Sequence, residues 1–170
     1  MFKNFFFLIF FILISNNVFA STKISFIDIT FLLEKSNAGM NITELLVKER
    51  EKETKKLMIL QEKIKKKEEE FKSRSNILND EEKNKIVQDL KKEVKNYNLL
   101  KAKKEKEFNI KKTKYINNLL KEINNIMISY IEKNSIDIVV KKENLVTGKK
   151  EYDITKIILD ELNKKKITFK

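Results

Sequence analysis

The sequence predicts an α+β fold that is mostly helical, in which a small β-containing body carries a long antiparallel coiled-coil hairpin of two helices. Strand-like runs of β-branched and aromatic residues occur near the two ends of the 170-residue chain, at Ile24–Ile29, Ile136–Val140 and Leu145–Thr147. The stretch between them, residues 41–133, is highly charged and repeats its apolar residues at helical spacing. The chain contains no proline, so nothing in it forces a long helix to end.

The composition excludes several classes of chemistry. The chain has no cysteine and no histidine, which removes zinc sites, thiol nucleophiles and imidazole bases. Its two glycines, Gly39 and Gly148, lie too far apart to build a phosphate-binding loop. No pair of carboxylates sits in a sequence that would form a pocket. We therefore expect no enzymatic activity, no cofactor and no metal site.

The first twenty residues have the pattern of a secretory signal peptide. Lys3 precedes an apolar run over residues 5–14, and Val18-Phe19-Ala20 places small residues where a signal peptidase reads them. The run is shorter than the ~20 residues that a membrane-spanning helix needs. We predict cleavage between Ala20 and Ser21 and export to the periplasm. The alternative is an uncleaved membrane anchor.

A strand and a short helix follow the signal. Ile24–Ile29 is apolar on both faces, so we expect this strand to be buried on both sides. A helix is expected over Phe31–Ala38, with Gly39 as its C-terminal stop.

Two long helices come next. Asn41–Glu44 resembles a capping box that would open a helix running to about residue 76. Residues 75–79 interrupt the pattern, and Asn79–Glu82 is a second capping box from which a helix can continue to Lys133. A short connection between long helices implies an antiparallel hairpin arm over residues 41–133, with its tip near residues 75–80.

The apolar rows that would join the two helices form a thin seam. Charged residues such as Lys67 and Lys104 fall on seam positions, and the apolar residues become denser toward Tyr115–Ile131. We therefore expect a firm root and an arm that flexes. The seam residues are Leu46, Leu57, Leu60, Ile64, Phe71 and Leu78 in the first helix and Ile86, Leu90, Val94, Tyr97, Leu100, Phe108, Tyr115, Leu119, Ile123, Ile126 and Tyr130 in the second.

The C-terminal zone should complete the body. Ile136–Val140 and Leu145–Thr147 would form a C-terminal β-hairpin, and Asp153 would cap a final helix. The body, residues 21–40 and 134–170, is too small to be comfortably stable alone, and its strands would have open edges. We therefore expect it to oligomerise. The residues expected to build the oligomer are Ile24, Phe26, Ile27, Ile29, Ile136, Ile138, Val139, Val140 and Leu145.

The chain is basic, with a formal net charge of +12. Residues 101–121 hold eight lysines against two glutamates. This stripe would either attract an anionic partner or be a solvated surface from biased composition. Nucleic acid is disfavoured, because the chain has few arginines and is predicted to be exported. The candidate contacts for a partner are Phe71, Ile77, Leu78 and Ile86 near the tip and Lys101, Lys103, Lys104, Lys111, Lys112 and Lys114 on the stripe.

Taken together, the parts resemble the OmpH family, also called Skp, of periplasmic outer-membrane-protein chaperones. The resemblance rests on the Ile24–Asp28 strand, the Ile136–Val140 strand and the Asp153-Ile-Thr155 helix start, in that order behind an export signal. It departs from the family in an extra tail over Lys164–Lys170.

The resemblance implies a homotrimer shaped like a jellyfish, whose arms enclose a cavity. It further implies a chaperone that holds unfolded outer-membrane β-barrel proteins without ATP, with anionic lipid or lipopolysaccharide as a further partner class. The alternative function is a structural or adaptor coiled-coil protein of the cell envelope, anchored by an uncleaved signal.

Overall fold

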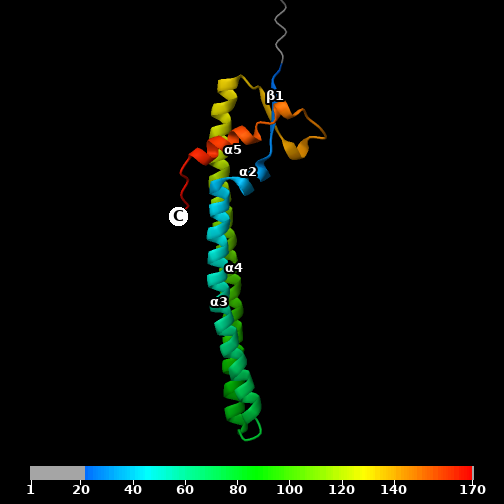
Figure 1. Cartoon of the computed structure of the whole chain (residues 1–170). Helices are drawn as coiled ribbons and strands as arrows, with labels where there is room; N and C mark the ends of the chain where they lie inside the picture. The colour runs from blue at the N-terminus through cyan, green and yellow to red at the C-terminus, as the bar shows by residue number, and fades with distance from the viewer. Residues whose placement is uncertain (1–21, 170) are drawn as a thin grey trace, which may run out of the picture.

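The computed structural model describes residues 22–169, which fold into a small body and one long arm (Figure 1). The signal peptide predicted over residues 1–20, with its cleavage site, lies outside the described residues. The predicted class, a mostly helical α+β fold with a long helical hairpin, is confirmed. The elements are β1 (Ile24–Ile27), α2 (Ile29–Lys35), α3 (Asn37–Arg74), α4 (Asp80–Asn134), β2 (Ile138–Lys141) and α5 (Thr155–Lys164).

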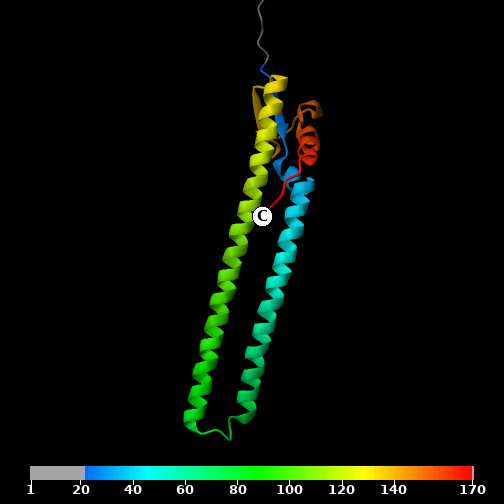
Figure 2. The same cartoon turned by 90° about the vertical axis from the view of Figure 1, so that its left-hand side faces the viewer.

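The arm consists of α3 and α4, which run side by side in opposite directions (Figure 2). Their 38 and 55 residues correspond to ~57 and ~82 Å at 1.5 Å per residue. The capping box predicted at the start of the second helix is confirmed, since Asn79 Oδ1 accepts from Glu82 N at 2.9 Å and Glu82 Oε2 accepts from Asn79 N at 3.1 Å. The C-terminal part of α4 continues past the arm and forms one wall of the body.

The sheet has two strands, and its pairing differs from the prediction. β1 and β2 are parallel, in a register that places Ile24 opposite Ile138 and Ile27 opposite Lys141. The predicted C-terminal β-hairpin is wrong, because Leu145–Thr147 forms no strand and Val146 is fully exposed. A 3₁₀ turn at Lys142–Asn144 leads the chain away from β2, so this short segment meets no strand that could supply ladder hydrogen bonds. The chain returns at Asp153, which bridges to Phe26.

The corner between α2 and α3 also corrects the prediction. α3 begins at Asn37 with Ser36 as its cap, whose Oγ accepts from Gly39 N at 3.0 Å. Gly39 is therefore not the stop of the short helix but lies in the first turn of the next one. The capping box predicted at Asn41–Glu44 is wrong for the same reason, since the helix has already begun.

The core lies where the root of the arm meets the body. Apolar side chains from α2, the start of α3, the second half of α4, and α5 pack together there. Asp153 Oδ1 accepts a hydrogen bond from Thr155 N at 2.9 Å, which fixes the start of α5 against this core. The buried members are Ile27, Leu32, Ala38, Ile42, Tyr115, Leu119, Ile123, Ile126, Ile136, Ile154, Ile158 and Leu162.

Candidate functional site

The arm is loosely packed along most of its length. The last buried residue of α3 is Ile42, and Tyr115 is the first buried residue of α4, so no residue from Thr43 to Lys114 is buried. The apolar rows of the two helices face each other but stay partly open to water. The root is therefore the more densely packed end, as the apolar pattern predicts, and the seam leaves apolar surface that another chain could reach.

Near the tip, the seam opens into a cavity of about 590 Å³ between α3 and α4. Phe71, Leu78 and Ile86, three of the predicted contact residues, line it together with Leu90. Charged side chains surround these apolar groups, among them Arg74 and Asp89. The fourth predicted tip residue, Ile77, lies in the turn and is 80% exposed.

Two further hollows in the middle of the arm are lined by both α3 and α4. One, of about 540 Å³, is lined by Leu60, Ile64, Tyr97 and Leu100. The other, of about 280 Å³, is lined by Leu57, Met58 and Phe108 together with charged residues. The sequence assigned the apolar residues of these hollows other than Met58 to the seam, and among the lining residues it proposed only Lys101 and Lys104 as contacts. The sequence does contain a signal for these hollows, namely the many charged residues on the seam positions. Charged side chains there prevent α3 and α4 from packing tightly against each other.

Ion pairs bridge the seam where apolar contacts are missing. Arg50 Nη1 lies 2.7 Å from Glu105 Oε2, and its guanidinium stands 4.8 Å from the ring centre of Phe108. The remaining pairs that join α3 to α4 are Lys67–Glu93, Lys104–Glu53 and Lys111–Glu49. All of these side chains are partly exposed, so each pair contributes little on its own. They fix the register of the helices without sealing the groove.

The pKa shifts along the arm come mainly from pairs within one helix for Glu53 and Glu107, and from a pair across the seam for Lys111. The pKa of Glu53 is lowered chiefly by the hydrogen bond from Lys56, and that of Glu107 chiefly by the hydrogen bond from Lys104. The pKa of Lys111 is raised chiefly by its hydrogen bond to Glu49. The charged forms of these groups are therefore favoured in the folded arm.

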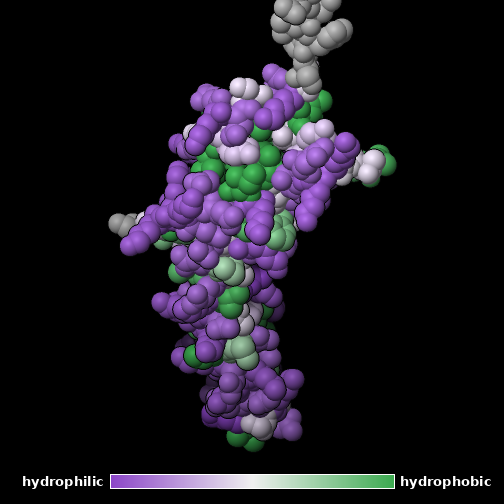
Figure 3. Space-filling view, turned by 45° about the horizontal axis from the view of Figure 1, so that its top comes forward, coloured by the Kyte–Doolittle hydropathy of each residue, from purple (hydrophilic) through white to green (hydrophobic). Residues whose placement is uncertain are grey.

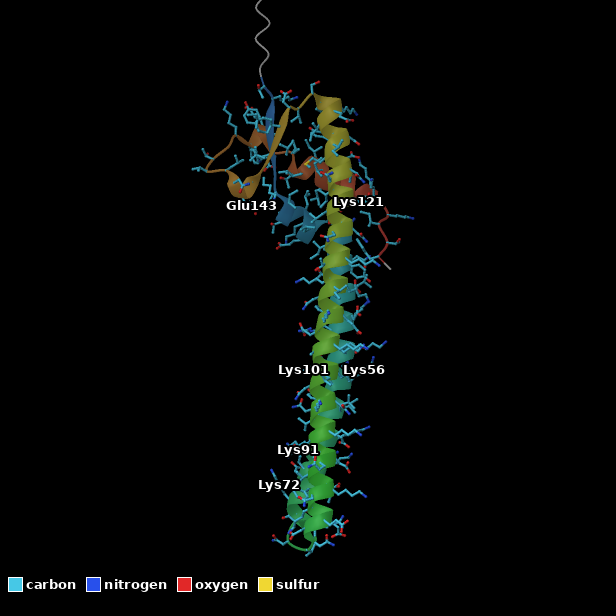
Figure 4. All side chains as sticks on the ribbon, turned by 180° about the vertical axis from the view of Figure 1, so that it is seen from behind. Lys56, Lys72, Lys91, Lys101, Lys121 and Glu143 are labelled. Atoms are coloured by element: carbon cyan, nitrogen blue, oxygen red, sulfur yellow. The ribbon has the colours of Figure 1, made fainter. Side chains whose placement is uncertain are left out.

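The structure divides the predicted lysine stripe into two groups. Lys104 and Lys111 turn into the seam and pair with α3, and Lys103 lies 3.9 Å from Glu107. Lys101, Lys112 and Lys114 are exposed. Figure 4 shows charged side chains, including Lys56, Lys72, Lys91 and Lys101, projecting along the arm. The outward lysines are the part of the stripe that is available to an anionic partner.

The residues predicted to build an oligomer are also divided. Phe26, Ile27 and Ile136 are buried inside the chain's own core, while Ile24 and Ile138, paired across the sheet, are each 48% exposed. Ile29, Val139, Val140 and Leu145 are half-buried. A hollow of about 650 Å³ beside β1 is lined by Ile24, Phe26, Val140, Leu145 and Tyr152, among others. Figure 3 shows a hydrophobic area on the body, framed by hydrophilic side chains.

Residues 22–169 contain no cluster of His, Cys, Asp and Glu side chains arranged to hold a metal ion. None of the helices in the same range combines the length and the apolar character that a membrane span requires.

A small α+β body that carries a long, loosely packed two-helix arm defines a class of arm-bearing, mostly helical proteins. The family model described as outer membrane protein (OmpH-like) matches residues 23–162. The chain therefore belongs to the OmpH-like family. No curated protein matches it.

Among solved structures, the chain is similar to one from Caulobacter crescentus CB15, assigned as an OmpH-like outer membrane chaperone. The two share 11% sequence identity, with a TM-score of 0.79, over 85% of this chain and 86% of the other. At this identity the likeness establishes the fold, and it agrees with the family match.

Proposed function

We propose that this protein is an ATP-independent holdase chaperone that binds unfolded outer-membrane β-barrel proteins along its arm and keeps them from aggregating. Family membership and the Caulobacter neighbour support a chaperone role. The observation that carries the finer proposal is the arm itself, in which apolar side chains line open hollows and no residue from Thr43 to Lys114 is buried.

The physical basis is a surface that offers many weak contacts. An unfolded chain presents scattered apolar side chains and no fixed shape, so a promiscuous binder must meet it with adaptable surface. The tip cavity supplies apolar groups such as Phe71 and Ile86 within a charged rim. Exposed lysines, Lys112 and Lys114 among them, add long-range attraction for acidic clients.

We infer that the protein works as a homotrimer assembled through its body. A two-stranded sheet is marginal on its own, and edge strands invite further pairing. Here Ile24 and Ile138 leave apolar surface exposed on adjacent strands, and Val146 follows them in an exposed segment. These features support completion of the body by other copies. Three arms would then surround one cavity.

We further propose that the protein acts in the periplasm after cleavage of its signal peptide between Ala20 and Ser21. The pattern of residues 1–20 supports this, as does membership of a family of outer membrane proteins. Anionic lipid or lipopolysaccharide is a second partner class that the outward lysines could attract.

The test combines an aggregation assay with a native mass measurement. An outer-membrane β-barrel protein is diluted out of urea into buffer with the chain lacking residues 1–20, without nucleotide, and light scattering is followed. We expect suppressed scattering and a trimeric mass. A variant with Phe71, Leu78 and Ile86 changed to Ser should suppress less, because it removes the apolar lining of the tip cavity.

The matched control is Leu99→Ser, which removes an apolar side chain that is 60% exposed and lies outside that cavity. It should leave suppression unchanged. If the unaltered protein does not suppress aggregation at all, the holdase proposal fails, and a structural or adaptor role in the cell envelope becomes the better-supported function.

A further inference from the structure

The last described residues of the chain return to the root of the arm. We name residues Lys165–Phe169 the C-terminal tail. It leaves α5 in extended conformation and runs beside the arm where α3 and α4 meet the body (Figures 1 and 2). Its side chains alternate, since Ile167 and Phe169 pack against the core while Lys166 and Thr168 are exposed. The family match ends at residue 162, so the tail lies beyond the part of the chain that matches the family.

The tail covers the place where the core ends. Tyr115 is 4% exposed and is the buried residue of α4 nearest the tip. The ring of Phe169 lies against it, with ring centres 5.5 Å apart and planes tilted by 55°. On the arm side, Lys111 Nζ stands 5.9 Å from the centre of the Tyr115 ring and pairs with Glu49 of α3. Tyr115 is thus held between a tail residue and a pair that joins the two helices.

A second contact joins the tail to α4 about two helical turns closer to the body. Lys165 Nζ lies 3.0 Å from Glu122 Oε2. With Phe169 on Tyr115, the tail is attached at two points that span residues 115–122 of α4. A bend of α4 in this stretch would have to separate at least one of them.

We propose that the C-terminal tail is a strap that sets where the rigid body ends and the flexible arm begins. With the strap in place, α4 is fixed as far as Tyr115, and the arm bends from that point outward. Without it, Tyr115 loses an aromatic partner and its cover from water, so the bending point moves toward Leu119. A hinge nearer the body gives a longer lever, and the tip then sweeps a wider range for the same change in angle.

Hydrogen exchange of the full assembled protein measures this directly. In Phe169→Ala, the amides of residues 111–118 should exchange about tenfold faster, because an aromatic pair and its burial protect that turn. The exchange rates of the amides of residues 123–130, and of residues 80–105 toward the tip of the arm, should not change. Thr168→Ala is the matched control, since it truncates the neighbouring exposed side chain, and it should change nothing.

A charge exchange gives a second variant that does not remove core contacts. Lys165→Glu should speed exchange around residue 122, and adding Glu122→Lys should restore it. Unchanged rates over residues 111–118 in Phe169→Ala would overturn the strap. An equal rise throughout the body would also overturn it, because Phe169 would then be a general core residue. None of these readouts requires a client, so the result is independent of the proposed holdase activity.

Discussion

At the scale of single residues, Ser36 and Gly39 allow two helices to meet at a sharp corner. Ser36 caps α3 and is fully buried. A Cβ placed on Gly39 would lie 1.8 Å from the carbonyl oxygen of Leu33, which belongs to the backbone of α2. Glycine is needed here because of this close approach and not because of an unusual backbone angle.

We therefore expect Gly39→Ala to destabilise the body by about 2 kcal/mol or more, because backbone atoms must move to admit the methyl group. Asn41→Ala, an exposed position on the same helix, should change stability by less than about 0.5 kcal/mol. Chemical denaturation followed by circular dichroism measures both. Equal stabilities for the two variants would show that the corner can relax.

The same residues show what a sequence pattern can and cannot predict. Asn79–Glu82 was predictable because a capping box is local, and all its atoms belong to four consecutive residues. The prediction that Gly39 ends the short helix is wrong because glycine is required there by the nearby backbone of Leu33. That contact exists only once the chain has turned between α2 and α3. Lys67 and Lys104 interrupt the apolar rows of the seam, but in the structure they pair with Glu93 and Glu53 across it. Such partners depend on the relative register of two helices, which the periodicity of each helix does not specify.

At the scale of elements, the arm carries ion pairs whose strength changes with pH. The pKa of Glu53 and that of Glu107 lie below their ordinary value of 4.5. Groups with lowered pKa stabilise the fold fully above that ordinary value, and their contribution is lost as the pH falls through the lower folded value. The root is held in addition by a buried apolar core, whose side chains do not titrate.

Acidification to about pH 3.5 should therefore loosen the arm before the body. Because the chain has no cysteine, spin labels can be placed at Met58→Cys and Ile110→Cys, both exposed and on opposite helices of the arm. The distance distribution between them should broaden on going from pH 6 to pH 3.5. A second pair within the body, at Phe31→Cys and Ile157→Cys, is the control. A pH-independent distribution in the arm would show that apolar contacts alone hold it.

The strands show the same limit of prediction for whole elements. β-Branched residues predicted strands at Ile24–Ile29 and Ile136–Val140, and the structure has strands at Ile24–Ile27 and Ile138–Lys141. Their parallel pairing joins residues 114 positions apart, and no local pattern reports such a contact. Leu145–Thr147 has strand composition but lacks a partner strand within residues 22–169. Composition therefore predicted which segments can form strands, and the presence of a partner strand decided which of them do.

At the scale of the whole molecule, charge is divided between the seam and the outer surface. Lysines that pair across the seam are already neutralised, whereas Lys101, Lys112 and Lys114 are exposed on the arm. Only the second group can contribute to long-range attraction of a client.

Changing Lys101, Lys112 and Lys114 to Gln should slow capture of an acidic unfolded client about three- to tenfold at low salt, with little effect near 0.5 M salt, where attraction is screened. The same three-charge reduction in the body, at the exposed residues Lys35, Lys150 and Lys156, is the control. Stopped-flow fluorescence with a labelled client measures both rates. Equal slowing by the two triple variants would assign the effect to net charge and not to the arm.

The parallel pairing of β1 with β2 also has a consequence for biogenesis. Lys23 N donates to Asp137 Oδ2 at 2.7 Å, so the first strand cannot complete its contacts until residues near 137 are available. A chain that emerges from its amino end exposes Ile24–Ile27 long before that point, whereas the hairpin can zip locally as soon as its second helix appears. The two helices of the arm should accordingly fold first. Pairing of β1 with β2 should be the late, slow step in the folding of each newly synthesised chain.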